Sequence, residues 1–343
     1  QLIKEGELKN EAQRKQLFFV LGALILFVLI ALFAFWQYLQ KRKANNQLTV
    51  QNIEISRQRD LIEDQQKGIM DSIHYASRIQ QAILPNEDYL DTFLGKNYFI
   101  LFKPRDIVSG DFYWIGTRNN KKIIVAADCT GHGVPGAFMS MLGTAFLNEI
   151  TNLHNEGLNA ALILNELRDY VISSLKQTGK KGEQKDGMDV SMYIYDEKTK
   201  MIEYAGANNP LFVVRKNPER FENWTEGRIS QEIFETEDGN GCALIHIKAD
   251  KMPIGIYSET YPFENVYFQL QEGDVLFNFS DGYVDQFGGP KNQKFLTKRF
   301  KKLLTNINQL PIKDQYIKIN DAIEDWKSGY EQIDDILVIG FKV

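Results

Sequence analysis

Hydrophobic and polar residues follow three different patterns along this chain. Residues 17–36 carry no charged or polar side chain, residues 40–84 carry an apolar residue at every seventh position, and short apolar runs separated by turns begin at Tyr98. A run of about twenty apolar residues can cross a bilayer as a helix, and a seven-residue period keeps one apolar seam along a helix. The patterns therefore predict a transmembrane helix, a linker helix and a sheet-rich domain over residues 85–343.

The charges that flank the apolar run predict its orientation. Lys41, Arg42 and Lys43 follow it directly, whereas residues 1–16 mix basic with acidic side chains. Because basic residues favour the cytoplasmic side, we expect a single-pass helix in the cytoplasmic (inner) membrane with the C-terminal part in the cytoplasm. A cleaved signal peptide is the alternative, but its apolar region is shorter and ends in a small-residue cleavage site. Since the chain starts at Gln1, residues 1–16 are expected to be a truncated flank.

The linker helix, residues 37–84, has one good seam and one poor one. Apolar side chains recur at Leu48, Ile55, Ile62, Ile69, Ala76 and Ile83. The companion seam is mostly polar, with Asn52, Arg59 and Gln66. A half-filled heptad predicts a weak coiled coil that makes a homodimer through residues 40–84; a lone amphipathic helix lying on the following domain is the alternative. Pro85 is expected to end the helix.

The soluble domain alternates short apolar runs with turns. Strands are predicted at residues 98–102, 111–115, 122–127, 190–195, 201–205, 211–215, 274–279 and 336–342. Helical spacing of apolar residues predicts helices over residues 136–153 and 158–175. Strands and helices in separate runs indicate an α+β sandwich rather than a βαβ series. Residues 216–250, rich in Glu, Asn, Gly and Thr, are expected to form an exposed hairpin or flap.

Composition excludes several classes of protein. The formal net charge of −5 argues against nucleic acid as a partner. The two cysteines, Cys129 and Cys242, are too few for a disulfide scaffold or a zinc ribbon and fit a reducing compartment.

Four short acidic motifs carry the candidate chemistry. They are Ser109-Gly110-Asp111, Ala127 to Gly133, Ser280-Asp281-Gly282 and Asp334-Asp335. Each places an aspartate beside an apolar run or a glycine turn. Because an unpaired buried charge is very costly, such an aspartate needs a partner. Converging strand ends of this kind would form a cage of hard oxygen ligands, which Mg²⁺ and Mn²⁺ prefer. A metal-dependent hydrolase is therefore the first hypothesis.

Each of these residues also has a plainer interpretation. Asp128 could cap its glycine turn by an Asx hydrogen bond. His132 could be a general acid or a metal ligand, but its flanking glycines are also typical of a backbone constraint. Cys129 lacks a Cys/His/Asn signature, so it is interpreted as a small packing residue rather than a nucleophile.

Over about Ile83 to Val343, the motifs resemble the SpoIIE/RsbU-like branch of the PPM (type 2C-like) metal-dependent serine/threonine protein phosphatases. The matching residues, in the family's order, are Ser109 to Tyr113, Ala127 to Gly133, Asp186 to Asp189, Ala205 to Asn208, Gly273-Asp274, Ser280 to Gly282 and Asp334-Asp335. The resemblance implies an αββα sandwich and a pair of Mn²⁺ or Mg²⁺ ions between two sheets. It departs from the family at Ser109, where glycine is common, and at Ala207, where histidine is common.

The resemblance also implies a ligand set. Asp128 would bridge the two ions and Cys129 would supply its backbone carbonyl. Asp111, Asp281 and Asp334 would complete the site. Asp335 would coordinate or only orient its neighbour, and Asp189 would touch a third ion or make a structural hydrogen bond.

The implied reaction is hydrolysis of phosphoserine or phosphothreonine by a water that the two ions activate. Lys103 or Arg105 is the candidate cation for the phosphoryl oxygens, and His132 is the candidate acid for the leaving oxygen. The expected partner is a phosphorylated regulatory protein in bacterial signalling, with a STAS-type anti-sigma-factor antagonist as the leading candidate. Two alternatives remain: a degenerate interaction module that binds no metal pair, and a two-metal nuclease or nucleotide hydrolase, which the acidic composition does not favour.

Overall fold

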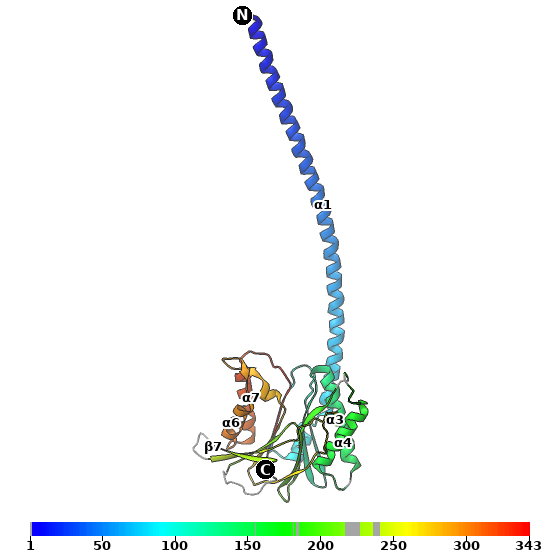
Figure 1. The fold of residues 1–343 in the computed structure, drawn as a ribbon, viewed down its shortest axis with the longest axis vertical. Coiled ribbons are helices and arrows are strands. Elements are labelled where there is room, and N and C mark those ends of the chain that lie inside the picture. Colours follow the sequence, from blue (N-terminus) through cyan, green and yellow to red (C-terminus); the bar gives the residue numbers. More distant parts are fainter. Residues whose placement is uncertain (1, 155, 181, 183–184, 217–226, 236–240) are drawn as a thin grey trace. The chain divides into compact units, whose positions relative to one another are not determined.

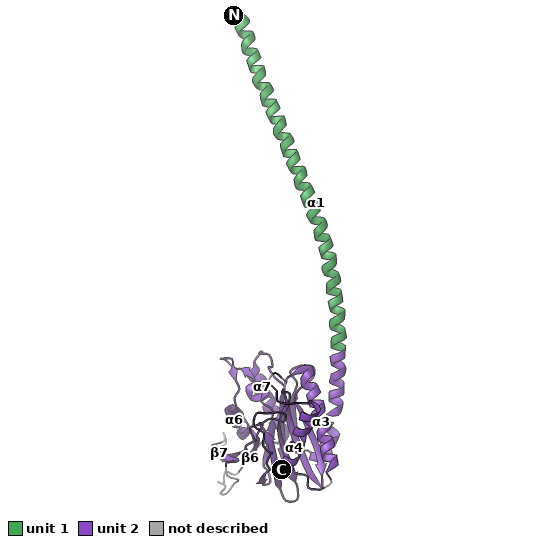
Figure 2. Ribbon diagram, turned by 45° about the vertical axis from the view of Figure 1, so that its right-hand side comes forward, with its two compact units in different colours: residues 1–71 green, residues 72–343 purple. Residues whose placement is uncertain are grey.

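A computed structural model describes residues 2–154, 156–180, 182, 185–216, 227–235 and 241–343 (Figure 1). The chain divides into two compact units, Gln1–Asp71 and Ser72–Val343 (Figure 2). The first unit is helical and the second contains both large sheets.

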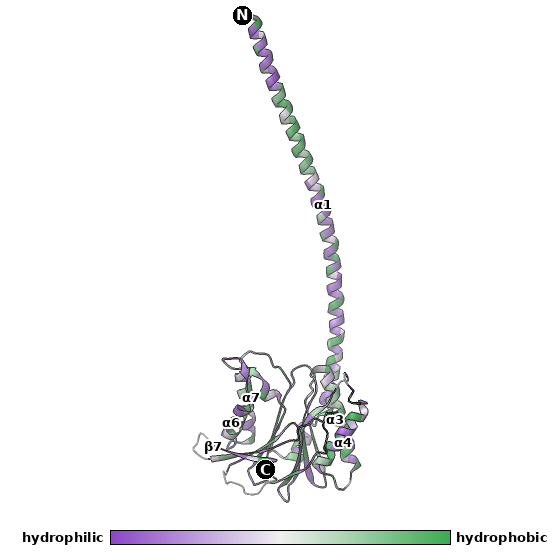
Figure 3. Cartoon of the chain, in the orientation of Figure 1, coloured by the Kyte–Doolittle hydropathy of each residue, from purple (hydrophilic) through white to green (hydrophobic). Residues whose placement is uncertain are grey.

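Helix α1 (Leu2–Ile83) begins in the first unit and its last residues, from Ser72, belong to the second. Its apolar stretch over residues 17–36 is visible in Figure 3, and the side chains there are exposed. In the described part of the chain, this is the one helix whose length and composition would allow it to cross a membrane. The helix ends two residues before Pro85, as predicted, because proline disfavours helical backbone in the residue before it.

The second unit is a four-layer αββα sandwich, which confirms the predicted fold class. One sheet has the order β1 (Tyr98–Lys103), β13 (Ile336–Lys342), β10 (Val275–Phe279), β6 (Leu211–Arg215), β8 (Gly241–Ile247) and β7 (Ile229–Glu235). The other has the order β2 (Phe112–Arg118), β3 (Lys121–Cys129), β4 (Met188–Asp196), β5 (Met201–Ala207) and β9 (Val266–Gln269). All neighbouring strands in both sheets are antiparallel.

Helices cover the outer face of each sheet (Figure 1). Helices α3 (Gly133–Leu153) and α4 (Ala160–Ser174) pack on the five-stranded sheet, and α6 (Thr297–Ile307) and α7 (Ile312–Lys327) pack on the six-stranded sheet. The shorter elements are α2 (Glu87–Leu94), α5 (Gly282–Asp285) and the hairpin of β11 (Phe287–Gly288) and β12 (Gln293–Lys294).

Strand β3 shows how the sequence builds the layers. Ile123 and Val125 belong to the core beneath α3 and α4, whereas Ile124 and Ala126 belong to the core between the two sheets. Successive side chains of a strand point to opposite faces, so a continuous apolar run is the pattern of a strand buried on both sides. A third core lies between the six-stranded sheet and α6 and α7.

The predicted elements correspond closely to those in the structure. All eight predicted strands and both predicted helices are present, and β7, β8 and β9 are additional strands. Strands β7 and β8 form the hairpin expected within residues 216–250, but the expected exposure is wrong for β8, which is mostly buried between β6 and β7. Residues 217–226 and 236–240 of that range lie outside the described residues.

Candidate metal centre

The acidic motifs lie where strands of both sheets end. Asp128 is near the end of β3 and pairs directly with Asp189 at the start of β4. Asp281 follows β10, and Asp334 and Asp335 precede β13. Because β10 and β13 are antiparallel, with Phe279 opposite Val338, the end of one strand and the start of the other lie at the same edge. Residues distant in sequence are thereby brought to one place.

A cavity of about 320 Å³ opens at this edge. It is lined by Asp128, Cys129, Thr130, Gly131, His132, Asp189, Asp281 and Asp334. Four carboxylates from four different strand ends therefore share one cavity. Lys103 and Arg105 are absent from the lining, and so are Asp111 and Asp335.

Asp128 has the most unfavourable electrostatic environment among the cavity residues. Burial raises the pKa of its carboxyl to about 8, and the charges of Asp281, Asp334 and Asp189 add to the effect. Burial and neighbouring acids also raise the pKa values of Asp281 and Asp334. A cluster of carboxylates that resist ionisation is what a divalent cation would stabilise, since the ion replaces mutual repulsion by attraction.

Asp111 is buried beside this cluster. Burial raises its pKa well above the usual range, the charge of Asp128 raises it further, and a hydrogen bond with Ser280 opposes the shift. Its Oδ2 atom is buried without a hydrogen-bond partner among the described residues. An orphaned carboxylate oxygen is costly, and a hard cation is a partner that would satisfy it.

Four carboxylates at one cavity fit Mg²⁺ or Mn²⁺, which prefer oxygen ligands. In the described part of the chain, no three His, Cys, Asp or Glu side chains already stand close enough together to hold one ion. The thiol of Cys129 is buried and its pKa is raised well above the usual range, so it is no thiolate nucleophile.

Asp335 is held by the backbone instead. Its Oδ1 accepts a hydrogen bond from the N–H of Arg105 at 2.6 Å, and its Oδ2 accepts one from the N–H of Gly110 at 2.7 Å. Both oxygens are thereby used to fix the loop that leads into Asp111. A Cβ at Gly282 would collide with the Asp335 carbonyl oxygen, so the two strand-end loops are in close contact. That Asp335 coordinates an ion or orients Asp334 stays a prediction, since the two hydrogen bonds of its carboxylate hold the Asp111 loop.

Asp189 has a partner that sequence reasoning missed. The side-chain amide of Asn208 donates a hydrogen bond to Asp189 Oδ1 at 2.8 Å. Burial raises the pKa of Asp189 to about 6, and this hydrogen bond opposes the shift. Asn208 has φ +57, a left-handed conformation that asparagine tolerates. Asp189 therefore makes a structural hydrogen bond with one oxygen while its side chain still lines the cavity.

The three remaining candidates, His132, Lys103 and Arg105, differ in how they are placed relative to the cavity. His132 Nδ1 lies 3.0 Å from Asp106 Oδ2, and Asp106 was not a predicted site residue. The Lys103 ammonium is engaged by Glu324 at 2.6 Å and by Asn320 at 2.7 Å, both on α7, so it is held away from the cavity. Arg105 acts closer to the cluster, because its charge lowers the pKa of Asp334.

Gln80, near the end of α1, was also missed. Its side chain is buried; its Nε2 donates to Ser109 O at 2.6 Å and to Ser140 Oγ at 2.8 Å, and its Oε1 accepts from Ser109 N at 3.1 Å. Gln80 thus connects the last turns of α1 to α3 and to the loop before Asp111. Its spacing gave no signal, because a glutamine on a polar helix is ordinarily exposed.

Solved structures share the fold of the second unit. The solved SiaA-PP2C domain of Pseudomonas aeruginosa is 29% identical, with a TM-score of 0.67 over 81% of this chain and 98% of that one. The PP2C phosphatase domain and regulatory fragment of SpoIIE from Bacillus subtilis is 17% identical, with a TM-score of 0.52 over 72% of this chain and 63% of that one. No curated protein matches the chain.

Fold and cavity together define the class: the second unit has a PP2C-like phosphatase fold. The family described as Stage II sporulation protein E (SpoIIE) matches residues 119–229 and 236–343, well over half of the chain. The chain belongs to the SpoIIE family, as its motifs indicated.

Proposed function

We propose that this protein is a membrane-anchored, metal-dependent phosphatase that removes phosphate from serine or threonine of a regulatory protein. The observation that carries the proposal is the convergence of Asp128, Asp189, Asp281 and Asp334 on one cavity, with the orphaned oxygen of Asp111 beside it. In a degenerate module that binds no metal, neutral residues could replace these aspartates, because a buried carboxylate without a partner is costly. In this chain, every position where an acidic residue is expected carries one.

Asp128 would bridge the two ions, with Asp111, Asp281, Asp334 and the Cys129 carbonyl as further ligands. When bound, two Mn²⁺ or Mg²⁺ ions would activate a water and neutralise charge on the phosphoryl oxygens. Asp335 would hold the loop of Asp111 in place through its two backbone hydrogen bonds. Arg105, whose charge already acts on Asp334, is a better candidate than Lys103 for orienting the phosphoryl group.

His132 would protonate the leaving serine or threonine oxygen. It lines the cavity, and its Nδ1 is paired with Asp106, which would leave Nε2 as the nitrogen that faces a substrate. A carboxylate on one ring nitrogen fixes the orientation of the ring.

The cellular setting belongs to the same proposal. The apolar stretch of residues 17–36 would anchor the protein in the cytoplasmic membrane, with the catalytic unit in the cytoplasm. Residues 40–84 would form a homodimeric coiled coil that carries a signal. The substrate would be a phosphorylated regulatory protein, with a STAS-type anti-sigma-factor antagonist as the leading candidate, and no nucleic acid would bind.

The direct test is an assay of residues 72–343 on a phosphoserine peptide and on p-nitrophenyl phosphate. The fragment begins at Ser72 because the compact unit begins there and includes Gln80. We expect hydrolysis with Mn²⁺ or Mg²⁺ and none with a chelator. No hydrolysis with either ion, together with no binding of Mn²⁺, would favour the degenerate module.

Replacing Gln80 by alanine should lower the hydrolysis rate at least tenfold at saturating Mn²⁺. The change leaves the backbone of Ser109 and the hydroxyl of Ser140 without their partner, which loosens the loop before Asp111. Gln81→Ala is the matched control, since Gln81 is exposed. Both variants are measured in the full chain and in residues 72–343. Equal hydrolysis rates for Gln80→Ala and the unmodified protein would show that Gln80 does not couple α1 to the site.

A further inference from the structure

Strand β1 leaves one edge of the six-stranded sheet open. It pairs with β13 on one side, and on the other side it pairs with no strand of the described residues. Natural proteins protect such edges with proline, bulges or inward charges. Tyr98 to Phe102 contains none of these, and Lys103 and Pro104 come only where the strand ends.

The register shows which backbone groups are open. Lys342 N–H donates to Asn97 O, so residue 97 and each second residue after it turn their backbone groups toward β13. Tyr98, Ile100 and Phe102 therefore turn their N–H and C=O groups to the open edge. These are the groups to which an added strand would bond.

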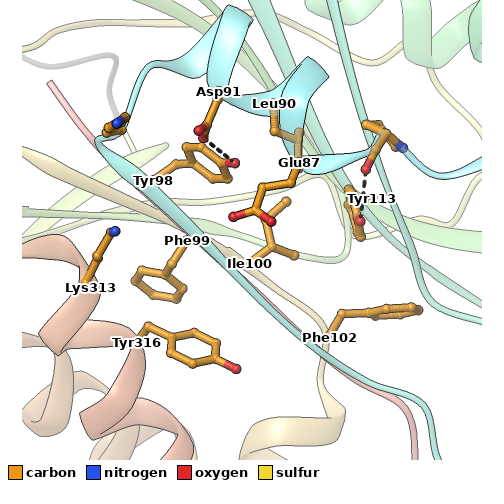
Figure 4. Close-up of a pocket in the computed structure, with 12 residues that line it drawn as sticks. Glu87, Leu90, Asp91, Tyr98, Phe99, Ile100, Phe102, Tyr113, Lys313 and Tyr316 are labelled. Atoms are coloured by element: carbon orange, nitrogen blue, oxygen red, sulfur yellow. Dashed lines mark hydrogen bonds between the residues drawn. The ribbon is translucent and has the colours of Figure 1, made fainter.

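The open edge lies in a groove of about 460 Å³ between α2 and α7 (Figure 4). Aromatic side chains line much of it: Tyr98, Phe99, Phe102, Tyr113 and Tyr316. Phe99 and Tyr316 form an edge-to-face pair with ring centroids 6.0 Å apart. The edge is therefore recessed between two helices, so a single extended segment fits it better than the edge of a second folded sheet.

The two sides of the groove differ in charge. Glu87 and Asp91 come from α2, and Tyr98 donates a hydrogen bond to Asp91 at 3.0 Å. Lys313 comes from α7, and Lys96 lies two residues before β1. Glu87, Lys96 and Lys313 are exposed, and no ion pair engages them within the described residues. Because side chains of a strand alternate between faces, an added strand would present one face to the acids of α2 and the other to Lys313.

We propose that the β1 edge binds an extended segment of the phosphoprotein substrate as an added strand, with basic side chains toward α2 and acidic ones toward α7. This inference rests on the proposed function in one respect, that the bound segment belongs to the phosphoprotein substrate. The direction of β1 favours a substrate: the strand leads through Arg105 to Gly110 and Asp111, so a segment paired along it would have one end directed at the metal centre.

The test uses the full chain in detergent micelles, free of metal, and a fluorescein-labelled peptide, Thr-Lys-Val-Val-Glu-Lys-Val-Thr, in which lysines occupy one face and glutamate the other. The charge-swapped peptide, Thr-Glu-Val-Val-Lys-Glu-Val-Thr, is the control. Ile100→Pro removes an outward N–H, a change that edge strands tolerate, together with the packing of the isoleucine side chain. Ile100→Ala is its matched variant, because it loses the same packing but keeps the N–H.

We expect the first peptide to bind at least tenfold more tightly than the swapped one and to slow hydrogen exchange of residues 98–103. Ile100→Pro should weaken binding at least tenfold relative to Ile100→Ala, and Glu87→Lys should reduce the preference between the peptides. Hydrolysis of p-nitrophenyl phosphate with Mn²⁺ should stay within about twofold in all variants.

Three results would overturn the proposal: equal binding of both peptides, equal binding by Ile100→Pro and Ile100→Ala, or self-association of the chain that Ile100→Pro abolishes. The last result would assign the edge to a second copy. Peptide binding is measured without metal, so it does not depend on catalysis. If the unmodified protein had no phosphatase activity, the proposed function would be contradicted, but the peptide-binding result would still test the β1 edge.

Discussion

Replacing Asp128 by alanine is expected to lower Mn²⁺-dependent hydrolysis by at least a thousandfold while the protein stays folded. Asp128 is the proposed bridge between the two ions, so its loss removes the charge that holds both of them. Burial raises the pKa of its carboxyl to about 8 and the neighbouring carboxylates add to the effect, so the ionised group costs stability in the folded state without metal. The melting temperature of the metal-free variant should therefore be equal or higher.

Asp196→Ala is the matched control for this experiment. Asp196 ends β4 at the opposite end from Asp189, and its Oδ1 accepts hydrogen bonds from the backbone of Lys198 and Thr199. It is thus a strand-end aspartate of the ordinary turn-capping kind. We expect its replacement to cost some stability and to leave activity unchanged. Full activity in Asp128→Ala would contradict the proposal that hydrolysis depends on a metal centre held by Asp128.

Asp335→Ala should lower both the hydrolysis rate and the stability of the protein. The change leaves the N–H of buried Gly110 and that of Arg105 without their acceptor, which should cost about 2–4 kcal/mol in the free energy of unfolding. The loop before Asp111 would move with it, so hydrolysis should fall at least a hundredfold. Thermal unfolding and the phosphoserine assay measure the two effects.

Asp334→Ala is the comparison that distinguishes a ligand from a support. Its carboxyl lines the cavity and resists ionisation, and it accepts one hydrogen bond, from Asp335 N–H at 2.9 Å. We expect a similar loss of activity but a stability loss of only about 1 kcal/mol. If both variants lost equal stability, the different roles assigned to these adjacent aspartates would be wrong.

The layers of the sandwich could be predicted from sequence because their signals are local. An apolar run such as Ile123 to Ala127 marks a strand buried on both faces, and an aspartate at its end marks a place where a charge needs a partner. Asp128, Asp281 and Asp334 were predicted for that reason, and the structure brings them to one cavity. Pro85 likewise predicted the end of α1.

What could not be predicted depends on contacts between distant segments. Asp334 and Asp335 are chemically identical neighbours, and only the position of the Arg105 to Gly110 loop separates a cavity acid from a backbone support. Lys103 and Arg105 are equally basic, but α7 engages one of them. Gln80 and Asp106 act through partners 29 and 26 residues away, and neither belongs to a motif.

The most direct measurement is an anomalous difference map from crystals of residues 72–343 grown with Mn²⁺. The account predicts two peaks inside the cavity, about 3.5–4 Å apart, held by Asp128, Asp281 and Asp334. An empty cavity at millimolar Mn²⁺, or ions bound only at other carboxylates, would contradict it.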